Sequence, residues 1–203
     1  MSSDKQLCTL SIDIGKKNTG YAIMTYNDIN TATFDNIQLE FGIFDIDESR
    51  KKDIVIVRCE SIRNFIQNIS NKYIIDRVII EKQVANNIVA MGIMYSIVTS
   101  CLEYTNNVVL YDPKHKFLDI HEKYTTKNKL HKRISTSYAK NMLHNKFTHL
   151  EKSFCSNKKK DDISDAINQM FTYYVTNGKM NINIKDYRSL LGLINIEDTI
   201  LNE

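Results

Sequence analysis

Residues 10–22, with the sequence LSIDIGKKNTGYA, constrain the fold of this chain more than any other stretch. An apolar run carries one carboxylate, Asp13, and leads into a glycine, two lysines, an asparagine and a second small turn at Thr19 and Gly20. The pattern predicts a strand, a tight turn and a second strand, with an acid near the end of the first strand. An ion in a buried strand is costly unless it is hydrogen-bonded, paired or bound to a metal. The rest of the chain must therefore supply partners for Asp13.

Apolar periodicity along the chain predicts an α/β fold. Three strands in a meander come first and alternating helices and strands follow, which implies a mixed central sheet with helices on both faces. After a loop that ends in the lysines at 158–160, a last long helix is expected, with Asp161 as its N-cap and Gly178 at its end. The other predicted strands and helices cover residues 7–14, 19–26, part of 37–46, 77–83 and 108–111, and residues 52–69, 87–104 and 126–147, respectively.

The length of 203 residues predicts one domain, which we place at residues 1–178. Residues 179–203 are expected to be a C-terminal extension with a short strand and a terminal helix, and no role is assigned to it. No apolar run approaches the roughly 20 residues of a membrane span, so no membrane partner is expected. The N-terminus lacks the layout of a signal peptide. Four widely spaced cysteines favour free thiols in a reducing compartment.

Positive charge is concentrated in one segment of the chain. Residues 114–160 hold thirteen Lys or Arg and three acids, whereas the remainder holds fourteen basic and twenty-one acidic residues. All five histidines also lie in this basic segment. A field of this kind indicates a polyanionic partner, and nucleic acid is favoured over a merely solvated basic surface.

Four acids stand out because each follows or faces an apolar run: Asp13 and Glu81 on strands, and Asp162 with Asp165 on one helix face. If these elements are adjacent, the carboxylates converge and cannot all stay ionised without cations. Carboxylate oxygens suit Mg²⁺ or Mn²⁺. Two such ions about 4 Å apart would clamp the attacking water and the leaving oxygen of a phosphodiester.

Each acid also has a purely structural explanation. Asp13 could cap the turn that follows it, Glu81 could be a surface acid paired with Lys82, and the two helical acids could serve the helix dipole. Asp161 is the rival of Asp162 as a metal ligand, although its capping role is favoured. The presence of a basic segment in the same chain favours the catalytic interpretation.

Basic residues near these acids are candidates for phosphate contacts, which position a nucleic acid without reading its sequence. Two lie in the turn beside Asp13, one follows Glu81, three immediately precede the acidic pair, and four lie on the predicted helix of the basic segment. A solvated surface is the alternative for each group. The candidates are Lys16, Lys17, Lys82, Lys127, Lys129, Lys132, Arg133, Lys158, Lys159 and Lys160.

Three short motifs follow one another: IDIGKKNTG at residues 12–20, IIEKQ at 79–83 and KKDDISDA at 159–166. In order and spacing, residues 7–175 resemble the RuvC-type Holliday junction resolvases, and within that group the poxvirus resolvases. The resemblance implies a ribonuclease H-like fold, a two-fold dimer and Mg²⁺-dependent nicking of opposed strands at a four-way DNA junction. It further implies resolution of concatemeric replication intermediates in the host cytoplasm.

By position, the resemblance makes Asp13, Glu81, Asp162 and Asp165 the metal-binding catalytic acids. It implies two Mg²⁺ ions per active site, with Mn²⁺ as a possible substitute. It places Gln83 beside the site without giving it a role.

The predicted helix over residues 87–104 is apolar around most of its circumference. Such a helix is either deeply buried or packed against another subunit. We therefore expect it to form the interface of a homodimer.

Two other functions stay open. A ribonuclease H-like nuclease acting on RNA–DNA hybrids or structured RNA would use the same four acids, and only its substrate would differ. An ATP-binding protein of the actin and sugar-kinase type also has a D-x-G loop near its start. That fold needs a second such loop and a longer chain, and neither is found here.

Overall fold

The structure, a computed structural model, describes residues 5–15, 18–46, 54–116 and 128–192. Its centre is a five-stranded sheet with the spatial order β3-β2-β1-β4-β5. The strands are β1 (Leu7–Asp13), β2 (Asn18–Tyr26), β3 (Gln38–Asp45), β4 (Ile74–Glu81) and β5 (Val108–Tyr111). The helices are α1 (Ile54–Lys72), α2 (Ile88–Cys101), α3 (Asn128–Lys146), α4 (Thr148–Ser156), α5 (Lys160–Thr176) and α6 (Ile184–Leu191), with short 3₁₀ turns η1 (Ile29–Thr31) and η2 (Pro113–Lys116).

The sheet is mixed, as predicted. β1, β2 and β3 form an antiparallel meander, whereas β4 pairs in parallel with both β1 and β5. Parallel neighbours need a crossover connection, and α2 provides it between β4 and β5. β4 begins three residues before the predicted strand because Ile74 and Ile75 extend the pairing with Leu7 and Cys8 of β1.

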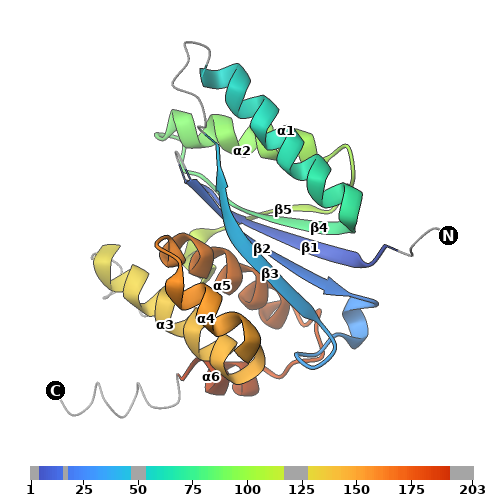
Figure 1. Ribbon diagram of the computed structural model, residues 1–203, viewed down its shortest axis with the longest axis vertical. Coiled ribbons are helices and arrows are strands. Elements are labelled where there is room, and N and C mark those ends of the chain that lie inside the picture. Colours follow the sequence, from blue (N-terminus) through green and yellow to red (C-terminus); the bar gives the residue numbers. More distant parts are fainter. Residues whose placement is uncertain (1–4, 16–17, 47–53, 117–127, 193–203) are drawn as a thin grey trace.

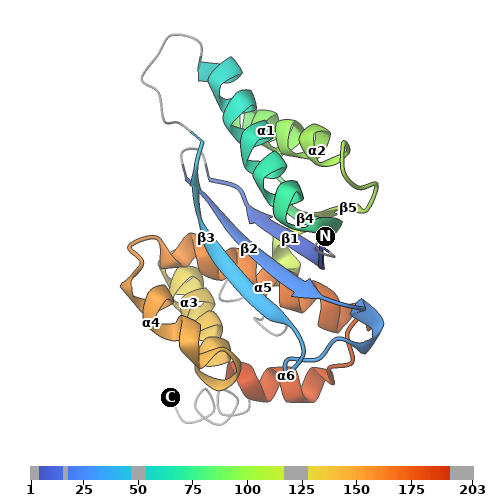
Figure 2. The same ribbon diagram turned by 45° about the vertical axis from the view of Figure 1, so that its right-hand side comes forward.

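Helices cover both faces of the sheet (Figures 1 and 2). α1 and α2 lie on one face, and α3, α4, α5 and α6 lie on the other. Strand side chains alternate between the two faces, so successive residues of the central strands enter different cores. Ile12 and Ile80 belong to the core beneath α1 and α2, whereas Ile79 belongs to the core beneath α5.

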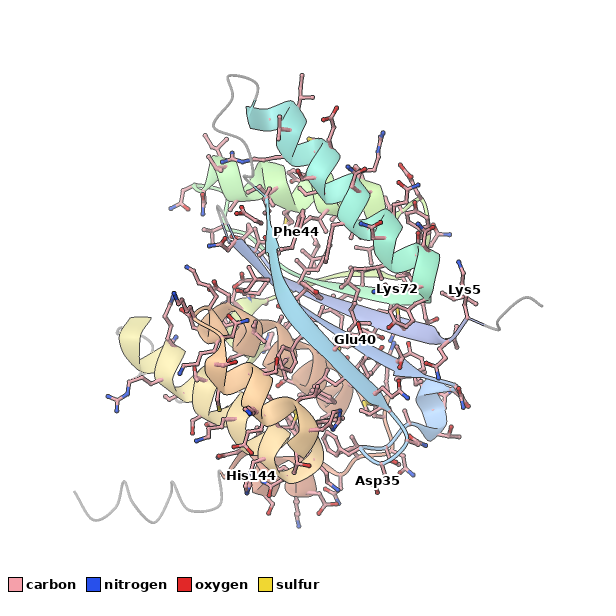
Figure 3. The ribbon with its side chains drawn as sticks, viewed as in Figure 1. Lys5, Asp35, Glu40, Phe44, Lys72 and His144 are labelled. Atoms are coloured by element: carbon pink, nitrogen blue, oxygen red, sulfur yellow. The ribbon has the colours of Figure 1, made fainter. Side chains whose placement is uncertain are left out.

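Side chains of the edge strand β3 contact α1 and the residue that follows it; the β3 residues involved, Glu40 and Phe44, are labelled in Figure 3. Phe44 of β3 stacks on Phe65 of α1 with 4.4 Å between ring centroids. The Tyr73 hydroxyl, directly after α1, donates a hydrogen bond of 2.5 Å to Glu40 Oε1. An unpaired strand edge invites association with other chains, and these contacts cover part of this one.

α2 is apolar around its circumference, as predicted, but only one side of it is buried. Ala90, Ile93 and Met94 are buried against the sheet, whereas Ile88 is 81% exposed and Tyr95 is 55% exposed. Exposed apolar patches of this kind are typical of interaction sites. Within the described ranges, no helix has both the length and the apolar character that a membrane crossing requires.

The prediction of a loop between the last two long helices is wrong, because the chain forms α4 there. Phe147 and Phe154 are buried, and the partly buried Leu150 packs against the same core. The ring of Phe154 meets Phe41 of β3 edge-on at 6.0 Å. This spacing of apolar residues lets one short helix cover the β3 side of the sheet.

The prediction that Asp161 caps α5 is also wrong. The helix begins at Lys160 with Lys159 as its N-cap, and no side chain bonds the cap. The preceding turn is closed instead by Asn157, whose Oδ1 accepts a hydrogen bond of 2.9 Å from the Lys159 backbone N–H. Asp161 therefore lies inside the first turn of the helix.

The predicted end of α5 at Gly178 is confirmed. Gly178 has a φ of +59°, and the N–H groups of Gly178 and Lys179 bond to the carbonyls of Val175 and Tyr174 at 3.4 and 3.1 Å. This pair of hydrogen bonds forms a Schellman cap, which needs a residue with a left-handed backbone conformation. Glycine adopts that conformation without strain.

The segment after Gly178 folds against the body of the protein. Residues 179–183 form no strand, but the predicted terminal helix is present as α6. Tyr187 and Leu191 of α6 are buried in the core beneath α5. The Asn141 side chain of α3 donates a hydrogen bond of 3.0 Å to the Leu191 carbonyl.

Candidate active site

Two of the predicted acids end neighbouring parallel strands. The last registered pair between β1 and β4 is Ile12 with Ile80, and Asp13 and Glu81 each follow it. Because Ile12 and Ile80 face α1 and α2, alternation turns the next side chain of each strand toward α5. Asp13 is 8% exposed and Glu81 is half-buried. The acids thus share one edge and one face of the sheet.

The start of α5 packs against the same edge through a glycine. Gly20 of β2 is the cross-strand partner of Asp13. A Cβ atom at Gly20 would lie 2.1 Å from the backbone oxygen of Asp162. Only a residue without a side chain allows this approach, and it places the first turn of α5 beside Asp13.

One side chain that the sequence analysis missed fixes α5 on the two acid-bearing strands. Gln169 is fully buried, and its amide nitrogen donates to Ser11 Oγ at 3.1 Å, to the Ile12 carbonyl at 3.3 Å and to the Ile79 carbonyl at 3.1 Å. The spacing of positions 162, 165 and 169 puts both helical acids on the face of α5 that carries Gln169. The available signal was an amide on the same helix face as the two acids.

Asp162 of α5 interacts electrostatically with Asp13 of β1. Burial, followed by the carboxylates of Asp161 and Asp13, raises the pKa of Asp162 to about 6, although Lys132 and Lys159 act in the opposite direction. A carboxyl group whose pKa is raised by neighbouring carboxylates marks accumulated negative charge. Such a site favours a bound cation.

Asp161 is committed to a different partner. Lys132 Nζ of α3 lies 2.5 Å from Asp161 Oδ2. Burial raises the pKa of Asp161, but the hydrogen bond and charge of Lys132, together with hydrogen bonds from the backbone N–H groups of Asp161 and Asp162, lower the pKa overall. The same contact raises the pKa of Lys132. Asp161 is therefore paired with Lys132, whereas the adjacent Asp162 interacts with Asp13.

The remaining two acids each accept a hydrogen bond from a neighbouring side chain. Gln83 Nε2 donates to Glu81 Oε2 at 3.0 Å, so the glutamine of the second motif holds the glutamate. Ser135 Oγ of α3 donates to Asp165 Oδ1. These bonds restrict the rotamers of both carboxylates.

The predicted phosphate-binding residues are only partly within the described ranges. Lys16, Lys17 and Lys127 lie outside them, and Lys129 is described only as a backbone position in α3. The others are exposed, and the charges of two of them, Lys132 and Lys159, lower the pKa of Asp162. The exposed candidates are Lys82, Lys132, Arg133, Lys158, Lys159 and Lys160.

The donor atoms fit a hard divalent cation. Carboxylate oxygens are the ligands that Mg²⁺ and Mn²⁺ prefer, and the raised pKa of Asp162 is the electrostatic condition that a cation relieves. Among the described residues, however, no three acidic, histidine or cysteine side chains stand together as a ready set of ligands. The four-acid metal site therefore stays a prediction, with Asp13 and Asp162 brought together and Glu81 on the adjoining strand.

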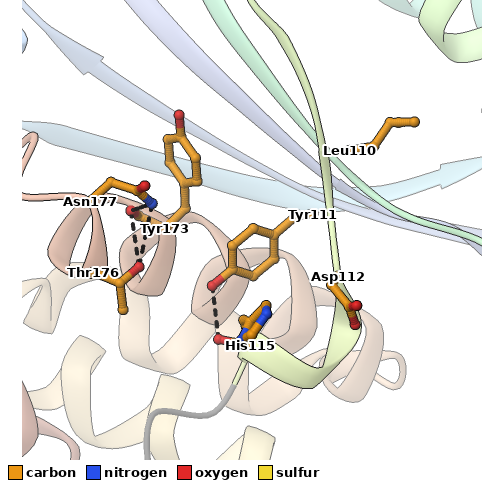
Figure 4. Close-up of a pocket in the computed structure, with 7 residues that line it drawn as sticks. All are labelled: Leu110, Tyr111, Asp112, His115, Tyr173, Thr176 and Asn177. Carbon is orange, nitrogen blue, oxygen red and sulfur yellow. Dashed lines mark hydrogen bonds between the residues drawn. The ribbon is translucent and has the colours of Figure 1, made fainter.

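A separate cavity of about 550 Å³ lies at the other end of α5 (Figure 4). It is bounded by the end of β5, by η2 and by the last turn of α5, and the Tyr111 hydroxyl donates a bond of 2.8 Å to the His115 carbonyl at its wall. Among the described residues, none of the predicted site residues lines it. The lining residues are Leu110, Tyr111, Asp112, His115, Tyr173, Thr176 and Asn177.

Comparison with solved structures shows the fold. The chain is similar to a fowlpox virus resolvase solved with its substrate Holliday junction DNA, with 21% identity over 84% of this chain and 98% of that one, and a TM-score of 0.61. It is also similar to the yeast mitochondrial Holliday junction resolvase Ydc2, with 11% identity over 94% and 87% of the two chains and a TM-score of 0.58. The predicted ribonuclease H-like architecture is confirmed.

Comparison of sequences shows the family. No curated protein sequence matches the chain. The model of the family described as poxvirus A22 protein matches residues 7–177, which include all three motifs and every predicted acid. The predicted relation to the poxvirus resolvases is thus confirmed, and this chain belongs to the poxvirus A22 protein family.

Proposed function

We propose that this protein is a structure-selective endonuclease that resolves four-way DNA junctions by hydrolysing one phosphodiester bond on each of two opposed strands. The observation that carries the proposal is the meeting of Asp13 and Asp162 at one sheet edge, beside exposed lysines. Family membership and the likeness to resolvases support it. The family also supports a role in concatemer resolution in the host cytoplasm.

The chain's own residues supply binding and orientation. Divalent cations, two Mg²⁺ or Mn²⁺ per site held by Asp13, Glu81, Asp162 and Asp165, would supply water activation and charge stabilisation. Gln83 holds the Glu81 carboxylate in one rotamer. Exposed lysines beside the site bind backbone phosphates and so place the scissile bond against the acids. The products would be religatable ends with a 5′-phosphate and a 3′-hydroxyl.

Opposed nicks need two active sites, and α2 offers a surface for a homodimer. Ile88, Tyr95 and Leu102, the residue that caps α2, are 81, 55 and 50% exposed. They are spaced seven residues apart, so they line one straight stripe along the helix. A two-fold axis brings such a stripe against its own copy. The dimer would then present one acidic site to each of two strands.

Cleavage assays with three substrates test the proposal. Purified protein with Mg²⁺ is given a labelled four-way DNA junction, the matching linear duplex and an RNA–DNA hybrid, and the Asp162→Asn variant is run beside it. We expect paired symmetric nicks on the junction alone, lost in the variant. Cleavage of the hybrid instead would move the function to RNA processing. Absence of cleavage from all three substrates would refute the proposed activity.

A further inference from the structure

A buried chain of hydrogen bonds leads from α5, through α3, to the carboxylate of Asp165. Ser135 of α3 is fully buried and Asn168 of α5 is 1% exposed. Asn168 Nδ2 donates to the Ser135 carbonyl at 2.9 Å and to Ser135 Oγ at 2.9 Å. Ser135 Oγ in turn donates to Asp165 Oδ1.

The partners fix the direction of every bond in this chain. A backbone carbonyl only accepts hydrogen bonds, so the nitrogen of the Asn168 amide, not its oxygen, must face Ser135. The serine hydroxyl accepts one of the amide hydrogens, and its single hydrogen is then directed at Asp165. A hydroxyl fixed on both sides in this way has one orientation.

The same stretch of α3 holds a second contact to the start of α5. Lys132 and Ser135 are three residues apart and therefore share a helix face. Lys132 contacts Asp161, and Ser135 contacts Asp165. α3 thus sets the first turn of α5 by a surface ion pair and a buried hydroxyl.

We propose that Ser135 and Asn168 are positioning residues that set the Asp165 carboxylate for cation binding, an inference that rests on the proposed function. Neither residue touches the substrate; both act through Asp165. Hydrogen bonds to ligand carboxylates fix ligand orientation, and removing such partners typically costs about 10- to 100-fold in metal affinity or activity. The same range is expected for loss of the Ser135 hydroxyl.

Direct measurement of Mn²⁺ binding tests the proposal without relying on turnover. Free aqueous Mn²⁺ is titrated by electron paramagnetic resonance against wild type, Ser135→Ala, Asn168→Ala and Asp165→Asn. We expect Ser135→Ala to weaken binding at least about 10-fold, and Asn168→Ala by about 5-fold, the worth of one hydrogen bond, because the hydroxyl remains but can rotate. Thr172→Val is the matched control, since Thr172 is also a buried hydroxyl on α5 and its Oγ1 lies 3.4 Å from the Tyr187 hydroxyl; it should bind Mn²⁺ as wild type does.

Each outcome separates this inference from the proposed function. If wild type binds Mn²⁺, Asp165→Asn weakens it and both positioning variants match wild type, the positioning role is refuted while the metal site stands. If wild type shows no Asp165-dependent binding, the metal site itself is refuted and the positioning role with it. Should Ser135→Ala fail to fold, Asn168→Ala decides: wild-type affinity in that variant would refute the role. A rise in the Mg²⁺ concentration for half-maximal junction cleavage, with unchanged junction affinity, would support it.

Discussion

The Cα atom of Gly20 lies against the backbone carbonyl of Asp162, so closely that a methyl group there would sit 2.1 Å from the oxygen and 2.4 Å from the carbon. Gly20 pairs with Asp13 across β1 and β2. The contact therefore joins the cross-strand partner of one acid to the backbone of another. It sets the distance between the sheet acids and the helix acids.

We expect Gly20→Ala to move α5 away from the sheet edge. The obstructing atoms belong to the backbone, which cannot rotate aside as a side chain would. Overpacking of this kind costs about 1–3 kcal/mol of unfolding free energy, and a shift of about 1 Å at a catalytic site can cost about 100-fold in rate. Urea unfolding and junction cleavage measure the two effects.

Gly92→Ala is the control for that change. Nothing lies within 4 Å of a Cβ at Gly92, in the middle of α2. This variant should gain up to about 1 kcal/mol from helix propensity. It is a control for stability alone, because Gly92 is exposed and lies between Ile88 and Tyr95 on the stripe proposed as the dimer interface. A Gly20→Ala protein as stable and active as wild type would show that the close approach does not set the site.

The two adjacent aspartates should respond differently to amide substitution. Asp162→Asn should abolish cleavage, because it removes a carboxylate that interacts with Asp13. Asp161→Asn should leave the rate within about 10-fold, because it breaks only the partly exposed pair with Lys132, and such pairs are worth about 1 kcal/mol or less. Single-turnover cleavage of a junction compares the two; equal losses would contradict the division of roles.

Stability should depend on the ionisation of Asp162 when metal is absent. Its pKa rises from 3.8 to about 6 on folding, so the folded state binds more protons than the unfolded state between these values. The free energy of unfolding contributed by this group therefore falls as pH rises from about 4 to about 6 and stays low above it. Asp162→Asn removes the penalty and should be the more stable protein at pH 7.5.

The expected gain is about 1 kcal/mol, well below the full value of two pKa units, because the half-buried carboxyl is screened by solvent. Thermal unfolding in a chelating buffer measures it as a rise of a few degrees in Tm. At pH 4 the difference should vanish, and saturating Mg²⁺ at pH 7.5 should stabilise wild type more than the variant. A variant less stable than wild type at pH 7.5 would contradict the sign.

The sequence was sufficient where a local pattern determines the structure. Short apolar runs that end in a carboxylate placed Asp13 and Glu81 at strand ends, and helical spacing placed Asp162 and Asp165 on one helix face. The left-handed end of α5 at Gly178 follows from the same kind of local rule. In each case the neighbours along the chain carry the information.

The sequence was insufficient where a distant contact determines the structure. Asp161 looked like a cap because its partner, Lys132, lies on another helix. Gln169 carried no recognisable motif, since its three acceptors belong to β1 and β4. α4 was missed because its stability comes from Phe154 packing against Phe41, and not from its own short sequence.

The exposed apolar stripe on α2 leads to a prediction about dimerisation. Ile88 is 81% exposed, so Ile88→Asp should leave the fold of a single chain intact. In the proposed dimer the same change would bury two charges without partners, which costs several kcal/mol. Sedimentation should therefore shift from dimer to monomer, and junctions should receive single nicks in place of paired ones. Ile184→Asp on α6, where Ile184 is 39% exposed, is the matched control and should stay dimeric; a monomeric wild type, or a dimeric Ile88→Asp, would remove α2 as the interface.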